Sequence, residues 1–195
     1  MSAASIFLLI ILIVALFVLI YGIMLYNNLV SLKHNVGKAW SNIDVLLKQR
    51  HDELPKLVEV CRQYMQYEQE ALEKIMKART QVASARETHN VGALGQAESQ
   101  LRLGLGQLFA VAEAYPDLKA NQTFRHLQDR ITELENTIAD RLEYYNESVN
   151  INNVRIEQFP DVIVARQFNF KSFELLTFSE AEKADVDVKA LFANK

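Results

Sequence analysis

The apolar residues of this chain form one continuous run and, after it, several periodic series. Residues 6–25 read IFLLIILIVALFVLIYGIML, twenty positions without a charge or a proline. A helix needs about 20 apolar residues to cross the hydrocarbon core of a bilayer. We therefore predict a transmembrane anchor over residues 6–25, preceded by a short tip over residues 1–5. Residues along the anchor that we expect to face lipid include Ile6, Leu12, Leu16 and Leu25.

A cleaved signal peptide is the alternative interpretation of this run. Such a peptide has a positively charged start, an apolar stretch of about 7–15 residues and a small-residue cleavage site. Residues 1–5 carry no charged side chain, the apolar run is longer, and residues 26–29 do not resemble a cleavage site. We favour an uncleaved anchor. Because Lys33 and Lys38 follow the span and basic residues favour the cytoplasmic side, we expect the N-terminus outside and the domain inside.

Beyond the anchor, apolar residues recur at the spacing of amphipathic helices. The first series begins at Leu29 and runs past Pro55 to Met76. Pro55 can begin a new helix or kink a continuing one. Because the apolar phase continues across it, we favour the kink and expect one helix from the membrane to about Ala85.

Two further apolar series predict two more helices. One covers residues 93–114 and is rich in small residues, and the other runs from Asn121, its expected N-cap, to Phe159-Pro160. The chain has only 3 prolines and 6 glycines, which favours long helices over many turns. We therefore predict an all-α fold: an N-terminal transmembrane helix followed by a bundle of long antiparallel helices over residues 27–159.

The remaining segment, residues 160–195, has a different pattern. Residues 162–170 are β-branched and aromatic rather than helix-periodic, so we expect a partly extended tail. Such a tail either packs along the bundle or docks on another subunit. Because a narrow bundle buries few of its aromatic rings, we predict a homo-oligomer with tail contacts between subunits. The candidate contact residues are Phe168, Phe170, Phe173 and Phe178.

Composition narrows the classes of partner. The formal net charge is −3 and both signs are interspersed, so we expect no nucleic acid partner. The single cysteine, Cys61, excludes an intramolecular disulfide. Its place in an apolar series indicates the core rather than a nucleophile.

Motifs for catalysis or metal binding are absent from the sequence. Neither Glu-x-x-His nor HExxH occurs, and the four histidines are scattered. We predict no catalytic residue, no metal site and no cofactor. Several charged residues do lie within or beside apolar stretches, which suggests an Arg–Glu network inside the bundle. A polar site is one interpretation of this network, and register-setting ion pairs are the one we favour. The residues are Arg50, Glu68, Arg79, Glu113, Glu135 and Arg141.

One segment resembles a known family. Residues 108–124, LFAVAEAYPDLKANQTF, closely resemble the hallmark segment of the LemA family, and other motifs of the family occur before and after it in the right order. The family positions inside the hallmark segment are Glu113, Tyr115, Pro116 and Asn121, and those outside it are Trp40, Pro55, Asn146 and Pro160. One departure is Asn169, where the family often has glycine, so the turn of the tail is expected to differ here.

The resemblance implies a membrane-anchored, all-helical bundle in bacteria, without established catalytic residues. Family members look like scaffolds, and some are linked to magnetosome membranes. We therefore predict a scaffold or adaptor in the inner membrane, with the lipid bilayer, further copies and other membrane proteins as partners.

Two other functions are considered. A membrane-remodelling or lipid-binding module needs a basic face near the bilayer, for which only Lys33, Lys38, Lys48 and Arg50 are candidates. An enzyme needs a polar site in the bundle core, and the sequence shows none.

Overall fold

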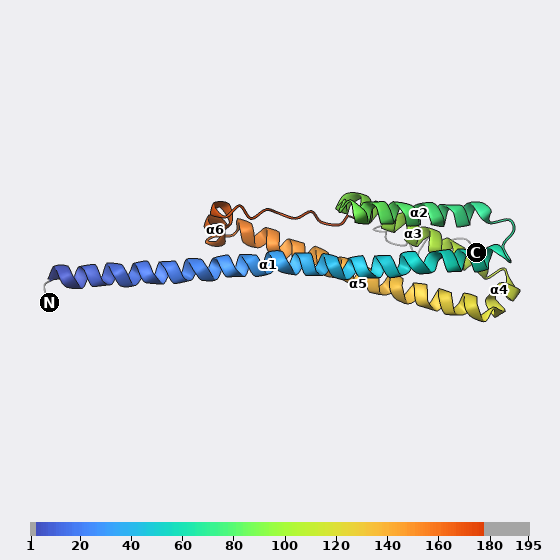
Figure 1. The fold of residues 1–195 in the computed structure, drawn as a ribbon, viewed down its shortest axis with the longest axis horizontal. Coiled ribbons are helices and arrows are strands. Elements are labelled where there is room, and N and C mark those ends of the chain that lie inside the picture. The colour runs from blue at the N-terminus through green and yellow to red at the C-terminus, as the bar shows by residue number, and fades with distance from the viewer. Residues whose placement is uncertain (1–2, 178–195) are drawn as a thin grey trace, which may run out of the picture. The chain divides into compact units, whose positions relative to one another are not determined.

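The computed structural model describes residues 3–177, and this part of the chain is helical without any strand (Figure 1). The six helices found there are α1 (Ala3–Arg62), α2 (Gln69–Glu87), α3 (Val91–Ala112), α4 (Pro116–Ala120), α5 (Gln122–Glu157) and α6 (Asp161–Gln167). The all-α prediction is confirmed. Contacts divide the described chain into two units: unit 1 has residues 3–42 and 143–174, and unit 2 has residues 43–142 and 175–177.

The longest element, α1, is a single helix of 60 residues that contains Pro55. The helix therefore continues across the proline, as the unbroken apolar phase predicted. Its N-terminal part is long and apolar enough to cross a membrane, with a mean hydropathy of 3.3 over its most apolar window and no residue of that window buried. An anchor over residues 6–25 is compatible with this helix.

The prediction that this helix reaches about Ala85 is wrong. α1 ends at Arg62, and α2 begins only at Gln69. No proline or glycine marks the break, but local hydrogen bonds satisfy its backbone: the N–H of Met65 donates to the carbonyl of Cys61 (2.8 Å), and the Gln69 side chain donates to the carbonyl of Met65 (3.0 Å). Because Cys61 and Met65 both stay buried, the turn keeps the apolar phase while the chain reverses.

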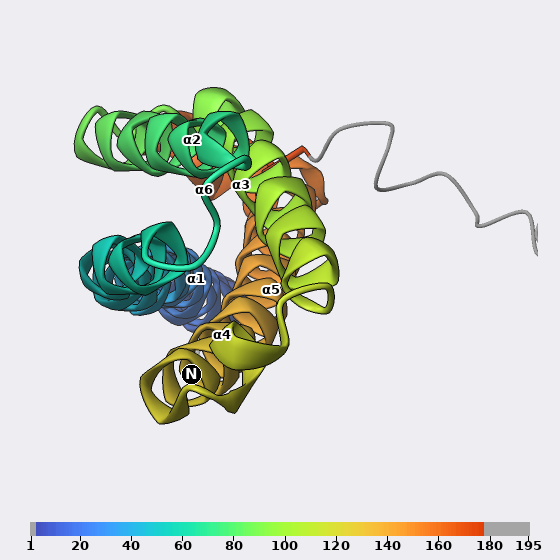
Figure 2. The same cartoon turned by 90° about the vertical axis from the view of Figure 1, so that its right-hand side faces the viewer.

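In unit 2, four helical segments run in alternating directions: α1 from residue 43, α2, α3 and α5 up to residue 142 (Figure 1). In both views α2 and α3 lie next to each other (Figure 2). A methyl group at Gly104 would lie 3.3 Å from Cγ1 of Ile75, so the glycine permits this close approach. The buried apolar side chains include Ile43, Leu47, Leu54, Leu57, Leu72, Ile75, Leu94, Leu101, Leu105, Phe124, Ile131 and Leu134.

Unit 1 comprises α1 up to residue 42, the end of α5, α6 and an irregular segment over residues 168–174. The extended conformation expected from residue 161 is wrong for residues 161–167, which form α6. The reason is a local contact together with burial: the buried carboxylate of Asp161 pairs with Arg155, six residues earlier (2.7 Å), and Ala165 is also buried. This packing outweighs the small helix penalty of β-branched residues.

The tail beyond α6 has neither helix nor strand from Phe168 to Thr177, in agreement with the partly extended tail expected. Asn169 adopts φ 55°, the left-handed conformation that glycine takes readily and asparagine tolerates. The departure from glycine at this position therefore leaves the turn intact.

Candidate functional site

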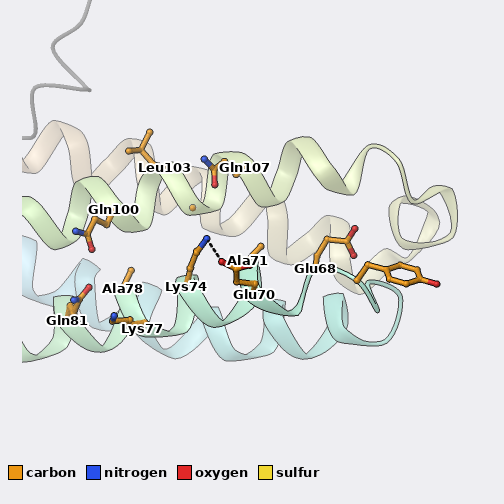
Figure 3. A pocket seen from close by; sticks show the side chains of 12 residues that line it. Glu68, Glu70, Ala71, Lys74, Lys77, Ala78, Gln81, Gln100, Leu103 and Gln107 are labelled. Atoms are coloured by element: carbon orange, nitrogen blue, oxygen red, sulfur yellow. Dashed lines mark ion pairs between the residues drawn. The ribbon is translucent and has the colours of Figure 1, made fainter.

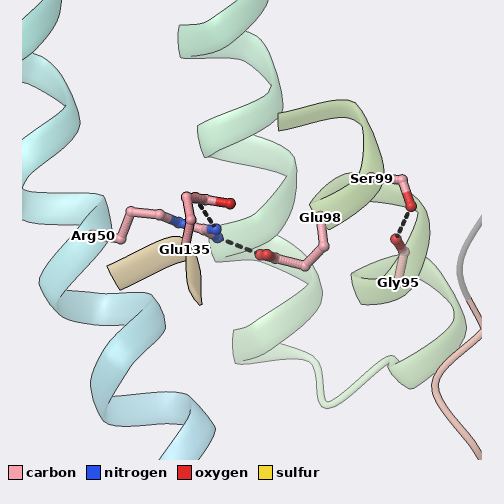
Figure 4. Close-up of polar contacts among 5 residues, drawn as sticks. All are labelled: Arg50, Gly95, Glu98, Ser99 and Glu135. Carbon is pink, nitrogen blue, oxygen red and sulfur yellow. Dashed lines mark hydrogen bonds and ion pairs between the residues drawn. The ribbon is translucent and has the colours of Figure 1, made fainter. Parts of the chain in front are cut away.

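The most enclosed charged group in the described chain is Arg50, on α1 in unit 2. Its side chain is 1% exposed and lies between two carboxylates, Glu98 from α3 and Glu135 from α5 (Figure 4). One guanidinium nitrogen donates to Glu135 at 2.6 Å, and the other donates to Glu98. A planar guanidinium suits two carboxylates at once, so this ion triad joins three helices at one level of the bundle.

The positive charge of Arg50 is balanced inside the bundle by its two carboxylate partners. Burial alone would lower the pKa of Arg50, but the charges and hydrogen bonds of Glu98 and Glu135 outweigh it and raise the pKa above its ordinary value. Arg50 is therefore charged at every physiological pH, and its donors are directed at the two carboxylates. Setting the register of packed helices is the best-attested role of buried polar groups of this kind. The burial of Arg50 also means that it does not belong to a lipid-facing basic surface, and the prediction that listed it as a candidate there is wrong.

The predicted Arg–Glu network is confirmed for Arg50 and Glu135 only. Glu113 is exposed and pairs with Lys119, and Arg141 is exposed. Arg79 donates to the carbonyl of His51 at 2.8 Å instead of pairing with a carboxylate. The sequence interpretation missed Glu98, because the small residues around it obscure which face of α3 is buried.

The hallmark segment forms the corner between α3 and α5. Pro116 opens the short helix α4, and the hydroxyl of Tyr115 donates to Glu68 at 2.6 Å. The side-chain oxygen of Asn121 accepts from the N–H groups of Thr123 (2.8 Å) and Phe124 (3.1 Å). Asn121 therefore caps α5, as its position in the sequence predicted, and its amide also donates to the hydroxyl of Tyr64 (3.1 Å).

Replacing Asn121 with alanine is expected to lower the free energy of unfolding by about 1 kcal/mol, the usual cost of losing an N-cap. Asn121→Asp keeps the accepting oxygen, loses the donor to Tyr64 and places a negative charge at the helix N-terminus, where it is favourable, so it should recover most of this loss. Chemical unfolding followed by circular dichroism measures both variants. Unchanged stability in Asn121→Ala, together with loss of a partner interaction, would instead identify the corner as a binding site.

Three other family positions lie in unit 1. The rings of Trp40 and Tyr145 meet edge to face with centroids 5.6 Å apart, and Asn146 is the next residue on α5. Pro160 precedes α6. The Trp40–Tyr145 contact joins α1 to α5, and Pro160 stands at the turn into α6.

A side-chain clamp that the sequence did not reveal holds the tail in unit 1. The amide of Asn153 donates to the carbonyl of Phe173 (2.8 Å), and its oxygen accepts from the N–H of the same residue (2.9 Å). The hydroxyl of Tyr145 donates to the carbonyl of Glu174 (3.1 Å). These side chains satisfy backbone hydrogen-bonding groups of the tail that a neighbouring strand would satisfy in a sheet.

The aromatic residues predicted for subunit contacts differ in their surroundings. The ring of Tyr26 on α1 contacts those of Phe168 (4.7 Å) and Phe170 (5.9 Å). Phe170 and Phe173 are half-buried, Phe168 is 59% exposed, and Phe178 lies outside the described residues. This part of the tail thus packs along its own chain, and its role between subunits stays a prediction.

In unit 2, the end of the described tail rests on α3. A Cβ atom at Gly95 would overlap the carbonyl oxygen of Thr177. Leu176, next to it, is only 3% exposed. Gly95 is thus the residue that lets the tail lie directly on the helix backbone.

A cavity of about 650 Å³ lies along α2 and α3 in unit 2 (Figure 3). Its lining includes Lys74, paired with Glu70 at 2.7 Å, and Glu68, the partner of Tyr115. Within residues 3–177 no group of three or more His, Cys, Asp or Glu side chains could hold a metal ion. We assign no substrate to this cavity.

Cys61 lies in the core, as its position in the apolar series predicted. Burial raises the pKa of its thiol to about 12. The thiol therefore stays protonated at neutral pH, and a protonated thiol is a poor nucleophile.

Comparison with known proteins identifies relatives along most of the chain. The model of the LemA family matches residues 39–190. Magnetosome protein MamQ 2 of Paramagnetospirillum magneticum is 25% identical, over 85% of this chain and 69% of its own length. Protein LemA of Metamycoplasma hominis is 28% identical, over 85% of this chain and 74% of its own length. Magnetosome protein MamQ of Magnetospirillum gryphiswaldense is 24% identical over the same shares as MamQ 2.

Proposed function

This chain belongs to the LemA family, and on that premise we propose that it is a membrane-anchored helical scaffold. In this proposal the helices self-assemble and present surfaces to other envelope proteins, and no catalysis is expected. The bundle lies on the cytoplasmic side of the bacterial inner membrane, where Lys33 and Lys38 follow the span. Labelling of a Ser41→Cys variant with a membrane-impermeant reagent in intact cells distinguishes the two orientations.

The observation that carries the proposal is an exposed apolar stripe on α5 in unit 1. Tyr144, Ile151 and Val154 are 45%, 43% and 42% exposed. Their spacing of seven and three residues places them on one helix face. Large apolar residues gathered on a surface mark an interaction site. We assign a second copy of the chain to this stripe, because anchors that lie side by side in one membrane bring equivalent α5 helices together in cyclic symmetry.

The ion triad supports a scaffold in a different way. Arg50, Glu98 and Glu135 direct their charges at one another, so this polar group of the core contributes to helix register instead of to a reaction. A bundle with a fixed register presents its outer faces in a constant arrangement, which repeated assembly requires.

Mass measurement of the detergent-extracted, full-length protein tests self-assembly. We expect an oligomer, and we expect Ile151→Lys with Val154→Lys to reduce it to a monomer. Asn150→Lys, an exposed polar position on the same helix, is the matched control and should leave the oligomer intact. A monomeric wild-type protein would refute the proposal, and an oligomer that survives the double substitution would refute the assignment to this stripe.

A truncated chain tests the prediction that the tail takes part in self-assembly. A chain truncated after Asp161 lacks Phe168, Phe170, Phe173 and Phe178. If these residues join subunits, the truncated chain should have a smaller mass than the oligomer by whole subunits. An unchanged number of subunits would exclude the tail from the interface.

A further inference from the structure

Within unit 1, α5 approaches the membrane end of α1 in a regular antiparallel register. Trp40 on α1 contacts Tyr145 on α5. Asn152 lies seven residues further along α5, and Lys33 lies seven residues back along α1. These two residues line the same cavity. Both helices rise about 1.5 Å per residue, so the same register continues beyond these contacts. It places Glu157, the last residue of α5, level with Asn28, three residues after the apolar run 6–25, and Phe159 follows two residues after the end of the helix.

Ring contacts place the next segment at the same level. Tyr26 contacts Phe168 and Phe170, the residues that follow α6. Figure 1 shows α6 directly after the end of α5. Tyrosine is enriched where a transmembrane helix leaves the hydrocarbon core, and Tyr21 and Tyr26 stand at this end of the apolar run. The segment 159–170 is therefore held at the height of the lipid headgroups.

This segment exposes three large apolar side chains, alongside the polar residues Arg166, Gln167 and Asn169. Phe159 is 81% exposed, Ile163 is 61% exposed and Phe168 is 59% exposed. These three large side chains lie within ten residues of one another at the one level of unit 1 where a bilayer surface is expected. Water is an unfavourable environment for them, whereas the boundary between headgroups and acyl chains accommodates such side chains.

Basic groups accompany this apolar surface. A cavity of about 550 Å³ beside it is lined by Lys33, His34 and Lys171, together with Tyr26 and Phe168. In the described part of the chain neither lysine takes part in an ion pair, while the nearby Asp161 is engaged by Arg155. Lysines next to a bilayer are attracted by anionic lipids.

We propose that residues 159–168 form a second membrane contact beside the anchor, here named the foot. Phe159, Ile163 and Phe168 insert at headgroup level, and Lys33 and Lys171 face the phosphates of anionic phospholipids. The foot rests on the proposed function only in requiring residues 6–25 to span the bilayer. We prefer a lipid surface to a second copy of the chain as the occupant, because this segment lies at the level where the span ends.

Spin labels on the full-length protein in vesicles test the foot. Cysteines replace Ile163 or Phe168 one at a time; the buried thiol of Cys61 is left in place as an unreactive site. We expect collisions with oxygen, which concentrates in lipid, to exceed collisions with an aqueous nickel complex severalfold at both positions. Asn150→Cys, an exposed polar position further from the span on α5, is the matched control and should show the reverse. Leu16→Cys reports on the anchor itself.

Each pattern of accessibility supports or overturns the foot. A label at Leu16 in lipid with labels at 163 and 168 in water overturns the foot and leaves the anchored scaffold standing. A label at Leu16 in water overturns both. Labels at 163 and 168 that are shielded from both reagents and broadened by neighbouring spins show a second copy in place of lipid, which also overturns the foot.

Lipid composition tests the charged part of the proposal. In phosphatidylglycerol vesicles, Lys33→Gln with Lys171→Gln should make the label at Ile163 severalfold more accessible to nickel. In phosphatidylcholine vesicles the same variant should match the protein with both lysines. Equal accessibility in the two lipids with and without the lysines would refute the contact with anionic headgroups.

Discussion

Replacing Arg50 with methionine is expected to lower the free energy of unfolding by about 3–5 kcal/mol, the cost of breaking a buried ion pair by removing one partner. Methionine fills part of the volume but leaves two carboxylates without their cation. The side chains of Glu98 and Glu135 are only 6% and 14% exposed, so water cannot readily take the place of the guanidinium. Chemical unfolding of the full chain in detergent, followed by circular dichroism, measures the loss.

Two further variants distinguish the effect of the buried charge on stability from the effect of the change in side-chain size and shape. Arg130→Met makes the same substitution in an exposed pair with Glu133, and it should cost less than about 1 kcal/mol. Arg50→Met combined with Glu98→Leu and Glu135→Leu removes all three charges and should recover most of the stability. If Arg50→Met were as mild as Arg130→Met, the ion triad would contribute nothing to the bundle.

Replacing Gly95 with alanine is expected to lower the free energy of unfolding by about 1–3 kcal/mol, the usual cost of adding a methyl group to a packed site. The new Cβ atom would overlap the carbonyl oxygen of Thr177, and backbone cannot move aside as a flexible side chain can. The tail must then lift from α3, and Leu176 loses its burial. Limited proteolysis near residue 177 should show faster cleavage in the variant.

The same helix supplies the control. No atom lies within 4 Å of a Cβ atom placed at Gly106. Alanine there should raise stability by up to about 1 kcal/mol, because alanine favours the helix more than glycine. Equal effects at Gly95 and Gly106 would show that the tail does not rest on α3 in solution.

The sequence was informative wherever one helix carries its own pattern. The apolar run predicted a helix able to span a bilayer, and the unbroken phase predicted a helix that continues through Pro55. The cap at Asn121 and the burial of Cys61 were also predictable, because each depends on neighbours a few residues away. These features are local or periodic, and a linear sequence records them directly.

Features that depend on distant segments were not predictable in this way. The turn over residues 63–68 keeps the apolar phase and contains no helix breaker, so it resembles continuing helix. α6 is a different case: its β-branched segment is helical although the pairing of Asp161 with Arg155 is only six residues away, because a single ion pair shows no repeating pattern in the sequence. Glu98 lies among small residues that give no clear face, and the clamp of Asn153 on Phe173 joins groups 20 residues apart. None of these contacts leaves a periodic pattern.

The continuity of α1 fixes the distance along the helix between the apolar run and Trp40. No linker separates the two, so the 15 residues from Leu25 to Trp40 set a height of about 22 Å at 1.5 Å per residue. Rotation is set as well, because one inserted residue turns everything beyond it by about 100°. With residues 6–25 spanning the bilayer as proposed, the Trp40–Tyr145 contact and the stripe on α5 stand at a constant height and direction above its surface. A partner in the same membrane must present its own contact face at that height, which selects partners by geometry before any side chain is recognised.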